Sequence, residues 1–379
     1  MTGFHFITTR QIICEPGSAS QAGSVAAALG AARLLLVTDA AISGIGLHEP
    51  VLTSLEQSGL KTTIFTGVQA DPPESVVADA LELARSAGVD CVIGLGGGSS
   101  MDVAKVVALM AKSGERLEQI YGVGKAKGGR LPLIQIPTTA GTGSEVTPIA
   151  IVTTGETTKQ GIVAPQLLPD AAILDANLTL GLPPFVTATT GIDAMVHAIE
   201  AFTSKHRKNP YSDMLAKEAL RLLTGNVEEA VKNGSNVEAR SGMLLGSMLA
   251  GQAFANAPVA AVHALAYPLG GYYHLAHGLT NALVLPHVLE FNEPAAGDLY
   301  TELAGIVNPD VPPSPASLVA RLRALTATCG LPVRLRDVEI PDTDLPMLAK
   351  DSMQHQRLLV NNPRDVSEQD ALAIYRAAY

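Results

Sequence analysis

A run of glycines between a predicted strand and a predicted helix restricts the fold more than any other feature of this chain. Residues 90–95, Asp-Cys-Val-Ile-Gly-Leu, are typical of a buried strand, and a helical pattern runs from about residue 100 to 112. In such a unit, glycines let the backbone approach a phosphate and the helix N-terminus attracts it. The loop Gly94-Leu95-Gly96-Gly97-Gly98-Ser99-Ser100 departs from the usual G-x-G-x-x-G pattern, because Ser99 stands at the third glycine position. Its place in the chain still predicts a pyrophosphate site.

The first half of the chain repeats this alternation of strand and helix. Apolar runs predict buried strands at 34–39, 61–65 and 133–136, and helical patterns cover 50–59 and 73–88. Strands that alternate with helices favour a parallel, doubly wound sheet with helices on both faces. We therefore expect a Rossmann-like α/β domain.

The pattern changes near Leu182, where strand-like runs stop and alanine-rich and leucine-rich helical patterns begin. Pro183-Pro184 marks this boundary, and Ser367 with Asp370 predicts the cap of a last helix. A chain of 379 residues is long enough for two domains. The sequence thus predicts a dinucleotide-binding α/β domain at 1–181 and an all-helical, metal-binding domain at 182–379.

Composition excludes several classes of protein. The net charge of −10, with no dense basic stretch, argues against a nucleic-acid partner. With 47% hydrophobic and 16% charged residues, we expect large buried surfaces and a homodimer or larger homo-oligomer. The most apolar long stretch, 246–271, contains Gln252, Asn256 and His263, so it predicts a buried helix and no membrane partner.

The N-terminus and the cysteines indicate the compartment. Residues 1–10 lack a basic segment followed by an apolar core, so no signal peptide is predicted. Cys14, Cys91 and Cys329 form no C-x-x-C pair, and we expect all three to be buried small apolar residues in a reducing compartment. The predicted localisation is cytoplasmic.

Candidate metal ligands lie in the second half. Asp193 and His197 are four residues apart, so a helix places both on one face, together with Glu200. Six of the nine histidines fall between His197 and His287. One carboxylate with up to three imidazoles suits a divalent transition metal such as Fe(II) or Zn(II). Glu200 is either a ligand or the acceptor of an imidazole N–H.

Spacing alone does not choose the remaining ligands, for which the candidates are His263, His274, His277 and His287.

Two further polar positions belong with the glycine loop. Asp39 ends the strand 34–39, where an acid accepts hydrogen bonds from ribose hydroxyls and repels a 2′-phosphate, which favours NAD over NADP. The alternative is a plain turn-forming aspartate. The polar turn 137–145 follows the strand 133–136, and its hydroxyls and amides are candidates to touch the diphosphate and the nicotinamide ribose. A metal and a dinucleotide in one chain suggest hydride transfer at an alcohol or carbonyl.

With these residues assembled, the chain resembles the iron-containing (group III) alcohol dehydrogenase family over most of its length. Four motifs in order carry the resemblance: Gly96-Gly97-Gly98-Ser99 with Asp102 and Lys105, Pro137-Thr138-Thr139 with Gly141-Thr142-Gly143-Ser144-Glu145, Asp193-Ala194-x-x-His197-Ala198-x-Glu200, and His277-Gly278-x-x-Asn281-Ala282-x-x-Leu285-Pro286-His287.

The resemblance implies an N-terminal Rossmann-like domain and a C-terminal helical domain, as in the dehydroquinate synthase-like fold. It implies an NAD-dependent, metal-dependent dehydrogenase that acts on a small alcohol or aldehyde, with Fe2+ as the first expectation and Zn2+ as the second. The implied metal ligands are Asp193, His197, His263 and His277. The implied cofactor-binding residues, besides Asp39, are Gly96, Gly97, Gly98, Ser99, Asp102, Thr138, Thr139, Thr142 and Lys159.

One departure from the family concerns proton transfer. Many members have a histidine where this chain has Tyr267, and Pro268 also differs. Tyr267 and His274 are the candidates to begin a proton relay, and the alternative is that they only shape the pocket. Some relatives reduce maleylacetate, so a ketoacid reductase is a second candidate function. A dehydroquinate synthase-like lyase would need Lys and Arg around the metal, and 193–200 and 263–287 contain none. A non-catalytic binding protein would not need the complete ligand set.

Overall fold

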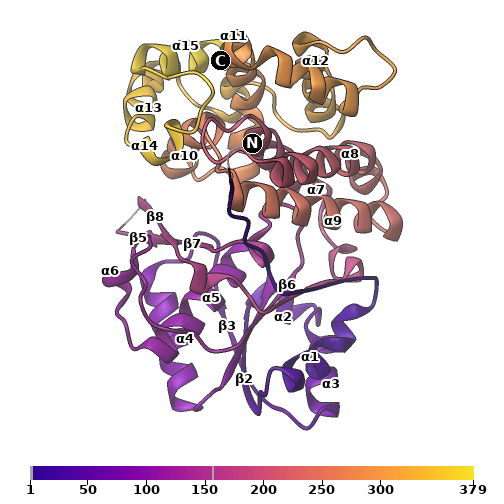
Figure 1. Cartoon of the computed structure of the whole chain (residues 1–379), viewed down its shortest axis with the longest axis vertical. Helices are drawn as coiled ribbons and strands as arrows, with labels where there is room; N and C mark the ends of the chain where they lie inside the picture. Colours follow the sequence, from indigo (N-terminus) through magenta and orange to yellow (C-terminus); the bar gives the residue numbers. More distant parts are fainter. Residues whose placement is uncertain (1–2, 156–157) are drawn as a thin grey trace. The chain divides into compact units, whose positions relative to one another are not determined.

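The computed structural model describes residues 3–155 and 158–379. Contacts within the chain divide it into two compact units, coloured along the sequence in Figure 1. Among the described residues, the first unit holds 8–139, 143–155 and 158–180, and the second holds 181–379 with the short segments 3–7 and 140–142. The main division between the two units falls after Leu180, and the two short segments pack with the helical unit.

The first unit is built on a six-stranded sheet in which every paired neighbour is parallel. Its strands, in spatial order, are β1 (Gln11–Cys14), β9 (Ala171–Leu174), β6 (Leu133–Pro137), β4 (Cys91–Gly96), β2 (Arg33–Asp39) and β3 (Lys61–Val68). The predicted doubly wound parallel sheet is confirmed. The two strands that the sequence did not indicate, β1 and β9, are only four residues long.

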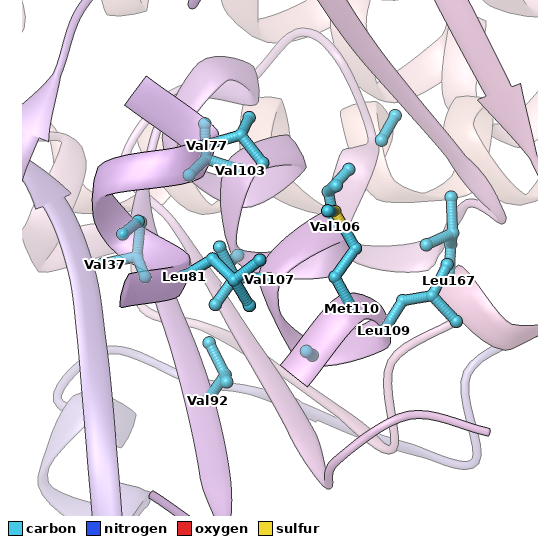
Figure 2. Packing of buried hydrophobic residues seen from close by; sticks show 14 of the residues in the cluster. Val37, Val77, Leu81, Val92, Val103, Val106, Val107, Leu109, Met110 and Leu167 are labelled. Atoms are coloured by element: carbon cyan, nitrogen blue, oxygen red, sulfur yellow. The ribbon is translucent and has the colours of Figure 1, made fainter. Parts of the chain in front are cut away.

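Helices cover both faces of this sheet, which explains why its inner strands β2, β4 and β6 are almost entirely buried. Along β2, Leu34 and Leu36 pack with one buried cluster, and Leu35 and Val37 pack with another. Figure 1 shows the helices of the two faces and Figure 2 shows side chains of the second cluster, including Val37. The helices of this unit are α1 (Ala22–Ala28), α2 (Ala40–Gly44), α3 (Glu49–Gln57), α4 (Glu74–Ser86), α5 (Gly98–Ser113) and α6 (Leu117–Ile120).

A small second sheet was not predicted. It contains β5 (Gly122–Val123), β8 (Thr158–Val163) and β7 (Ile149–Thr154), and β7 pairs antiparallel with β8. The sequence Thr-Lys-Gln-Gly-Ile-Val of β8 is too polar to form an apolar run. Pairing with β7 in the tertiary structure makes it a strand, because an antiparallel partner satisfies the backbone groups whatever the side chains are.

Residues 181–379, all of which the structure describes, form helices and loops without a strand. The helices are α7 (Pro184–Thr203), α8 (Pro210–Lys232), α9 (Val237–Asn256), α10 (Ala261–Tyr273), α11 (His277–Val307), α12 (Pro315–Thr328), α13 (Leu345–Ser352), α14 (Gln356–Leu359) and α15 (Glu368–Ala378). This confirms the helical C-terminal part, and α15 begins at the predicted Ser367 cap, whose side chain accepts from the amide of Asp370.

Two expectations need correction. The apolar stretch 246–271 is two helices, because α9 ends at Asn256 and α10 starts only at Ala261. Cys14 is exposed at the end of β1, whereas Cys91 and Cys329 are buried as expected. None of the helices in the described residues has the length and apolar character that a membrane crossing needs.

Candidate metal and nucleotide sites

Three helices bring a carboxylate and two imidazoles to one place. Asp193 lies on α7, His263 near the start of α10, and His277 at the first position of α11. Their ligand atoms lie within 4.8 Å of one another. Asp193 Oδ1 is 3.9 Å from His263 Nε2 and 3.7 Å from His277 Nε2. These distances suit atoms that share one cation, since each would lie about 2 Å from it.

A glycine allows His277 to come this close to α7. A Cβ atom at Gly278 would lie 2.1 Å from the carbonyl oxygen of Thr189 and 3.3 Å from the Cβ of Asp193. No other residue fits there without moving α11 away from α7. Gly278 therefore holds the start of α11, and with it His277, against the helix that carries Asp193.

His197 stacks beside this group. Its ring centroid is 4.7 Å from that of His263, with 26° between the planes. Its Nδ1 atom is 3.2 Å from the carbonyl oxygen of Gly141, so Nδ1 carries the proton and Nε2 carries the lone pair. Burial lowers the pKa of His197 to about 4, and the ring is neutral at pH 7, as a metal ligand requires. His197 is therefore suitable as a fourth ligand, although it is not among the three mutually close groups.

Glu200 supports His263 and the start of α10. Its Oε2 accepts from His263 Nδ1 at 2.6 Å and from the Ala260 amide at 2.9 Å, and its Oε1 accepts from the Val262 amide at 2.7 Å. Both carboxylate oxygens are thus used within the protein. Of the two roles considered for Glu200, the structure shows the acceptor of an imidazole N–H, which directs Nε2 of His263 toward Asp193.

The other histidines take different positions. His274 is exposed at the C-terminal end of α10 with a left-handed backbone, φ 52°. His287 lies 3.5 Å from Glu290 on α11. Neither belongs to the group of mutually close ligand atoms found in the described residues. Of the four candidates that spacing left open, His263 and His277 have ligand atoms in this group.

Tyr267 borders the group on its accessible side. Its ring centroid is 5.7 Å from that of His277 and 5.0 Å from that of His355, which meets it edge-on. The side chain of His277 is 33% exposed, whereas Asp193 and His263 are almost fully buried. The accessible edge of the group therefore lies at His277. The sequence did not indicate His355, because no local spacing links it to the other residues.

Asn281 is a second residue whose role the sequence did not indicate. It lies one turn after His277 and is fully buried. Its Nδ2 is 2.6 Å from Asp193 Oδ1 and 3.4 Å from the Nε2 atoms of both His263 and His277. Asn281 belongs to a motif that carries the family resemblance, but only the packing of α11 on α7 shows what its amide contacts.

The candidate nucleotide residues gather at the carboxyl ends of adjacent strands. Asp39 ends β2, Gly96 ends β4, and Thr138 follows β6. The Thr138 amide donates to the Gly96 carbonyl oxygen at 3.0 Å, so the two turns lie side by side. In doubly wound sheets, ligands bind outside the carboxyl ends of the strands.

The glycine loop has the geometry of an anion site. Gly96 has φ 149°, and a Cβ there would lie 2.7 Å from Ser100 Oγ. Gly97 precedes α5, which also contains Gly98 and Ser99, and no described side chain caps this helix. A Cβ at Gly97 would lie 3.7 Å from Thr139 Oγ1, so Thr139 borders the loop. The first amides of α5 are therefore available to a phosphate.

Asp39 has the structural role that was the alternative to ribose binding. Its Oδ1 accepts from the amides of Ala41 and Ile42, both at 2.9 Å, and so caps α2. Contact with a ribose is untested and stays a prediction. Lys159, on β8, pairs with Asp71 at 2.7 Å. Thr142 lies in the segment 140–142, which packs with the helical unit.

Asp102 holds the second turn instead of facing outward. Its Oδ1 accepts from Ser144 Oγ at 2.6 Å and its Oδ2 from the Ile151 amide at 2.9 Å. Lys105, fully buried, donates to Ser144 Oγ at 2.7 Å, and burial lowers the pKa of Lys105 to about 8. Glu145 is also buried, and burial raises the pKa of its carboxyl to about 7. This network joins α5 to the turn and to β7.

Known proteins match the whole chain. The family model described as iron-containing alcohol dehydrogenase matches residues 9–176, and the model of the C-terminal part of that family matches 187–379. Long-chain-alcohol dehydrogenase 1 of Geobacillus thermodenitrificans is 42% identical over 360 residues, which cover 93% of this chain and 90% of the relative.

Solved structures agree. The crystal structure of a 1,3-propanediol oxidoreductase has a TM-score of 0.96 at 35% identity and full coverage of both chains. Sulfoacetaldehyde reductase of Bifidobacterium kashiwanohense, solved in complex with NAD+, has a TM-score of 0.92 at 28% identity, covering 100% of this chain and 99% of the other. The chain belongs to the iron-containing alcohol dehydrogenase family and is an oxidoreductase that acts on alcohols.

Proposed function

We propose that this protein transfers a hydride between NAD and a small alcohol or aldehyde at a divalent metal held by Asp193, His197, His263 and His277. The observation that carries the proposal is the convergence of Asp193, His263 and His277 within 4.8 Å. Fe2+ is the first candidate because the matching family model is named for iron, and Zn2+ is the second because the same ligands suit it.

The donor set fits such a metal. It combines one carboxylate with imidazoles, and each imidazole whose Nδ1 partner is described carries its lone pair on Nε2. For His263 that partner is Glu200, and for His197 it is the Gly141 carbonyl. A buried charge is costly unless an opposite charge lies beside it, so the burial of the Asp193 carboxylate supports the presence of a cation here.

NAD binding is supported by two features. One is the uncapped start of α5 next to the Gly96–Gly98 turn, which suits a diphosphate. The other is Asp39 at the carboxyl end of β2, whose negative charge disfavours a 2′-phosphate. The relative solved with NAD+ agrees with this assignment. We propose that Ser99, Thr138, Thr139, Thr142 and Lys159 complete the cofactor site, and that Asp102 acts on it by holding the turn at Ser144.

Oxidation of an alcohol removes one hydride and one proton. When bound, the metal supplies a Lewis acid that lowers the pKa of the alcohol, and NAD supplies the hydride acceptor. The protein contributes the rest: Asp193 offsets the positive charge, Glu200 keeps the proton of His263 on Nδ1, and Tyr267 limits the space beside His277. The proton has to leave past His277, which is the exposed side of the group. Tyr267 is the better candidate for a relay than His274, because its ring contacts that of His277.

The proposed substrate is a small alcohol or aldehyde. The relatives act on long-chain alcohols, 1,3-propanediol or sulfoacetaldehyde, according to their names. No Lys or Arg occurs in 193–200 or 263–287, which favours an uncharged alcohol over a phosphorylated or multiply anionic substrate. The apolar composition supports a homodimer or larger homo-oligomer, and we propose a cytoplasmic location; light scattering and cell fractionation test these two points.

The decisive experiment measures NADH formation from alcohols, and NADH consumption with carbonyl compounds, by protein loaded separately with Fe(II), Zn(II), Co(II) or Mn(II). The substrates are straight-chain alcohols, diols and, in the reverse direction, aldehydes and ketoacids. We expect metal-dependent oxidation of at least one uncharged alcohol, and loss of activity in Asp193→Ala. Reduction of ketoacids alone would identify a maleylacetate reductase-like enzyme instead. Inactivity with every substrate in every metal form would refute the proposal.

A further inference from the structure

We propose that Asn281 is a positioning residue that orients Asp193 for metal binding, an inference that rests on the metal site proposed above. Asn281 is fully buried on α11, and one amide nitrogen reaches candidate ligand atoms from three helices. Its Nδ2 donates to Asp193 Oδ1 at 2.6 Å and lies 3.4 Å from Nε2 of both His263 and His277.

The orientation of this amide is determined by its neighbour. In the metal-free protein, an amide turned over would place its oxygen against Asp193 Oδ1, and two acceptors would repel each other at 2.6 Å. With Nδ2 toward Asp193, the Oδ1 of Asn281 is buried and has no hydrogen-bond partner among the described residues. An unpaired buried acceptor costs about 1–3 kcal/mol. A leucine, whose side chain has the same branched shape, would avoid this cost, so the value of Asn281 lies in what its Nδ2 contacts.

The contribution we infer is control of the Asp193 carboxylate. A hydrogen bond from Nδ2 engages one lone pair of Oδ1 and prevents rotation of the carboxylate about its Cβ–Cγ bond. The remaining lone pairs then keep one direction relative to His263 and His277. Groups that orient ligands in this way typically change metal affinity by about 10–100-fold when they are removed.

The test measures metal affinity without substrate or NAD. Co(II) and Zn(II) are titrated into metal-free protein in competition with a chromophoric chelator, and the visible spectrum of the Co(II) form reports ligand geometry. We expect Asn281→Leu to bind both metals about 10–100-fold more weakly and to alter the Co(II) spectrum. The matched control is Asn292→Leu on the same helix, because Asn292 is also buried but bonds to Asn362. Its metal affinity should stay within about twofold of wild type, since distant sites act independently.

Circular dichroism shows whether each variant folds. If Asn281→Leu does not fold, Asn281→Ser takes its place, because a serine hydroxyl is too short to reach Asp193 and should cause the same loss of affinity. A folded variant at position 281 that binds metal within about threefold of wild type, with an unchanged Co(II) spectrum, would overturn the inference. Equal losses in the Asn281 and Asn292 variants would also overturn it, because they would indicate a purely structural effect.

Failure of the proposed function is a separate result. If wild-type protein binds metal and Asn281→Leu weakens binding, but no alcohol is oxidised, the positioning role stands and the proposed activity fails. If alcohol is oxidised and the variant binds metal normally, only the positioning role fails. Wild-type protein that binds neither metal would overturn both.

Discussion

Replacing Glu200 with glutamine tests the connection between α7, α10 and the metal group. The carboxylate of Glu200 accepts three hydrogen bonds, from the amides of Ala260 and Val262 and from His263 Nδ1. Glutamine offers only one acceptor oxygen at this place, and its NH2 group is a second donor. If the glutamine oxygen faces Ala260 and His263, the NH2 group meets the Val262 amide, and two buried donors are left unpaired.

The opposite orientation has a different consequence. The NH2 group would then face His263 Nδ1, which can accept only if the imidazole proton moves to Nε2. That tautomer has no lone pair toward Asp193 and does not bind a metal. Both orientations therefore weaken the site. Two unpaired buried donors cost roughly 2–6 kcal/mol at about 1–3 kcal/mol each, and the lost support of His263 should lower metal affinity about 10–100-fold.

The assay combines thermal unfolding of metal-free protein with Zn(II) competition titrations. We expect Glu200→Gln to lower Tm by at least about 4 °C, at roughly 2 °C per kcal/mol for a domain of this size. Glu290→Gln is the control, because Glu290 is a half-exposed carboxylate on α11 that pairs with Arg323 at 2.8 Å; its effect should stay below about 1 kcal/mol. A Glu200→Gln protein with Tm within about 1 °C and Zn(II) affinity within about twofold of wild type would refute this reasoning.

Three further predictions concern the cofactor, the pocket and pH. Both Asp39→Gly and Asp39→Asn should raise the NADP/NAD ratio of kcat/KM, because both remove the negative charge. The asparagine variant should keep the cap of α2 and so separates the charge effect from the structural role. Unchanged ratios in both variants would place the carboxylate away from the ribose. Tyr267→Phe should keep kcat within about tenfold of wild type, whereas Tyr267→Ala should change which alcohols are accepted. A loss of kcat greater than about tenfold in Tyr267→Phe would assign the hydroxyl to proton transfer. Burial raises the pKa of Glu145 from 4.5 to about 7, so its contribution to stability is present at low pH and is lost as pH rises through 7. In wild-type protein this effect lowers the free energy of unfolding by at most about 1.4 kcal/mol per pH unit between about pH 5 and pH 7. Glu145→Gln should therefore show a smaller fall in Tm over this range. Equal falls in Tm for the variant and wild type would contradict this.

Features that depend on neighbouring residues could be predicted from the sequence. The apolar run 90–95 and the glycines after it indicated the strand, the turn and the helix start, because each has a local signature. Asp193 and His197 could be placed on one helix face for the same reason, since four residues make about one helical turn. The order of the motifs then sufficed for the family, and the comparisons confirmed it.

Which distant residues meet depends on the packing of the helices and could not be predicted from the sequence. Asn281 and Asp193 are 88 residues apart, and Glu200 and His263 are 63 apart, so no spacing rule connects them. Their contacts depend on how closely α11 and α10 pack on α7, which Gly278 and the carboxylate of Glu200 control. That the polar segment β8 forms a strand likewise follows only from its pairing with β7. Periodicity describes the face of one element, whereas the side chains that meet across elements depend on the packing of the whole unit.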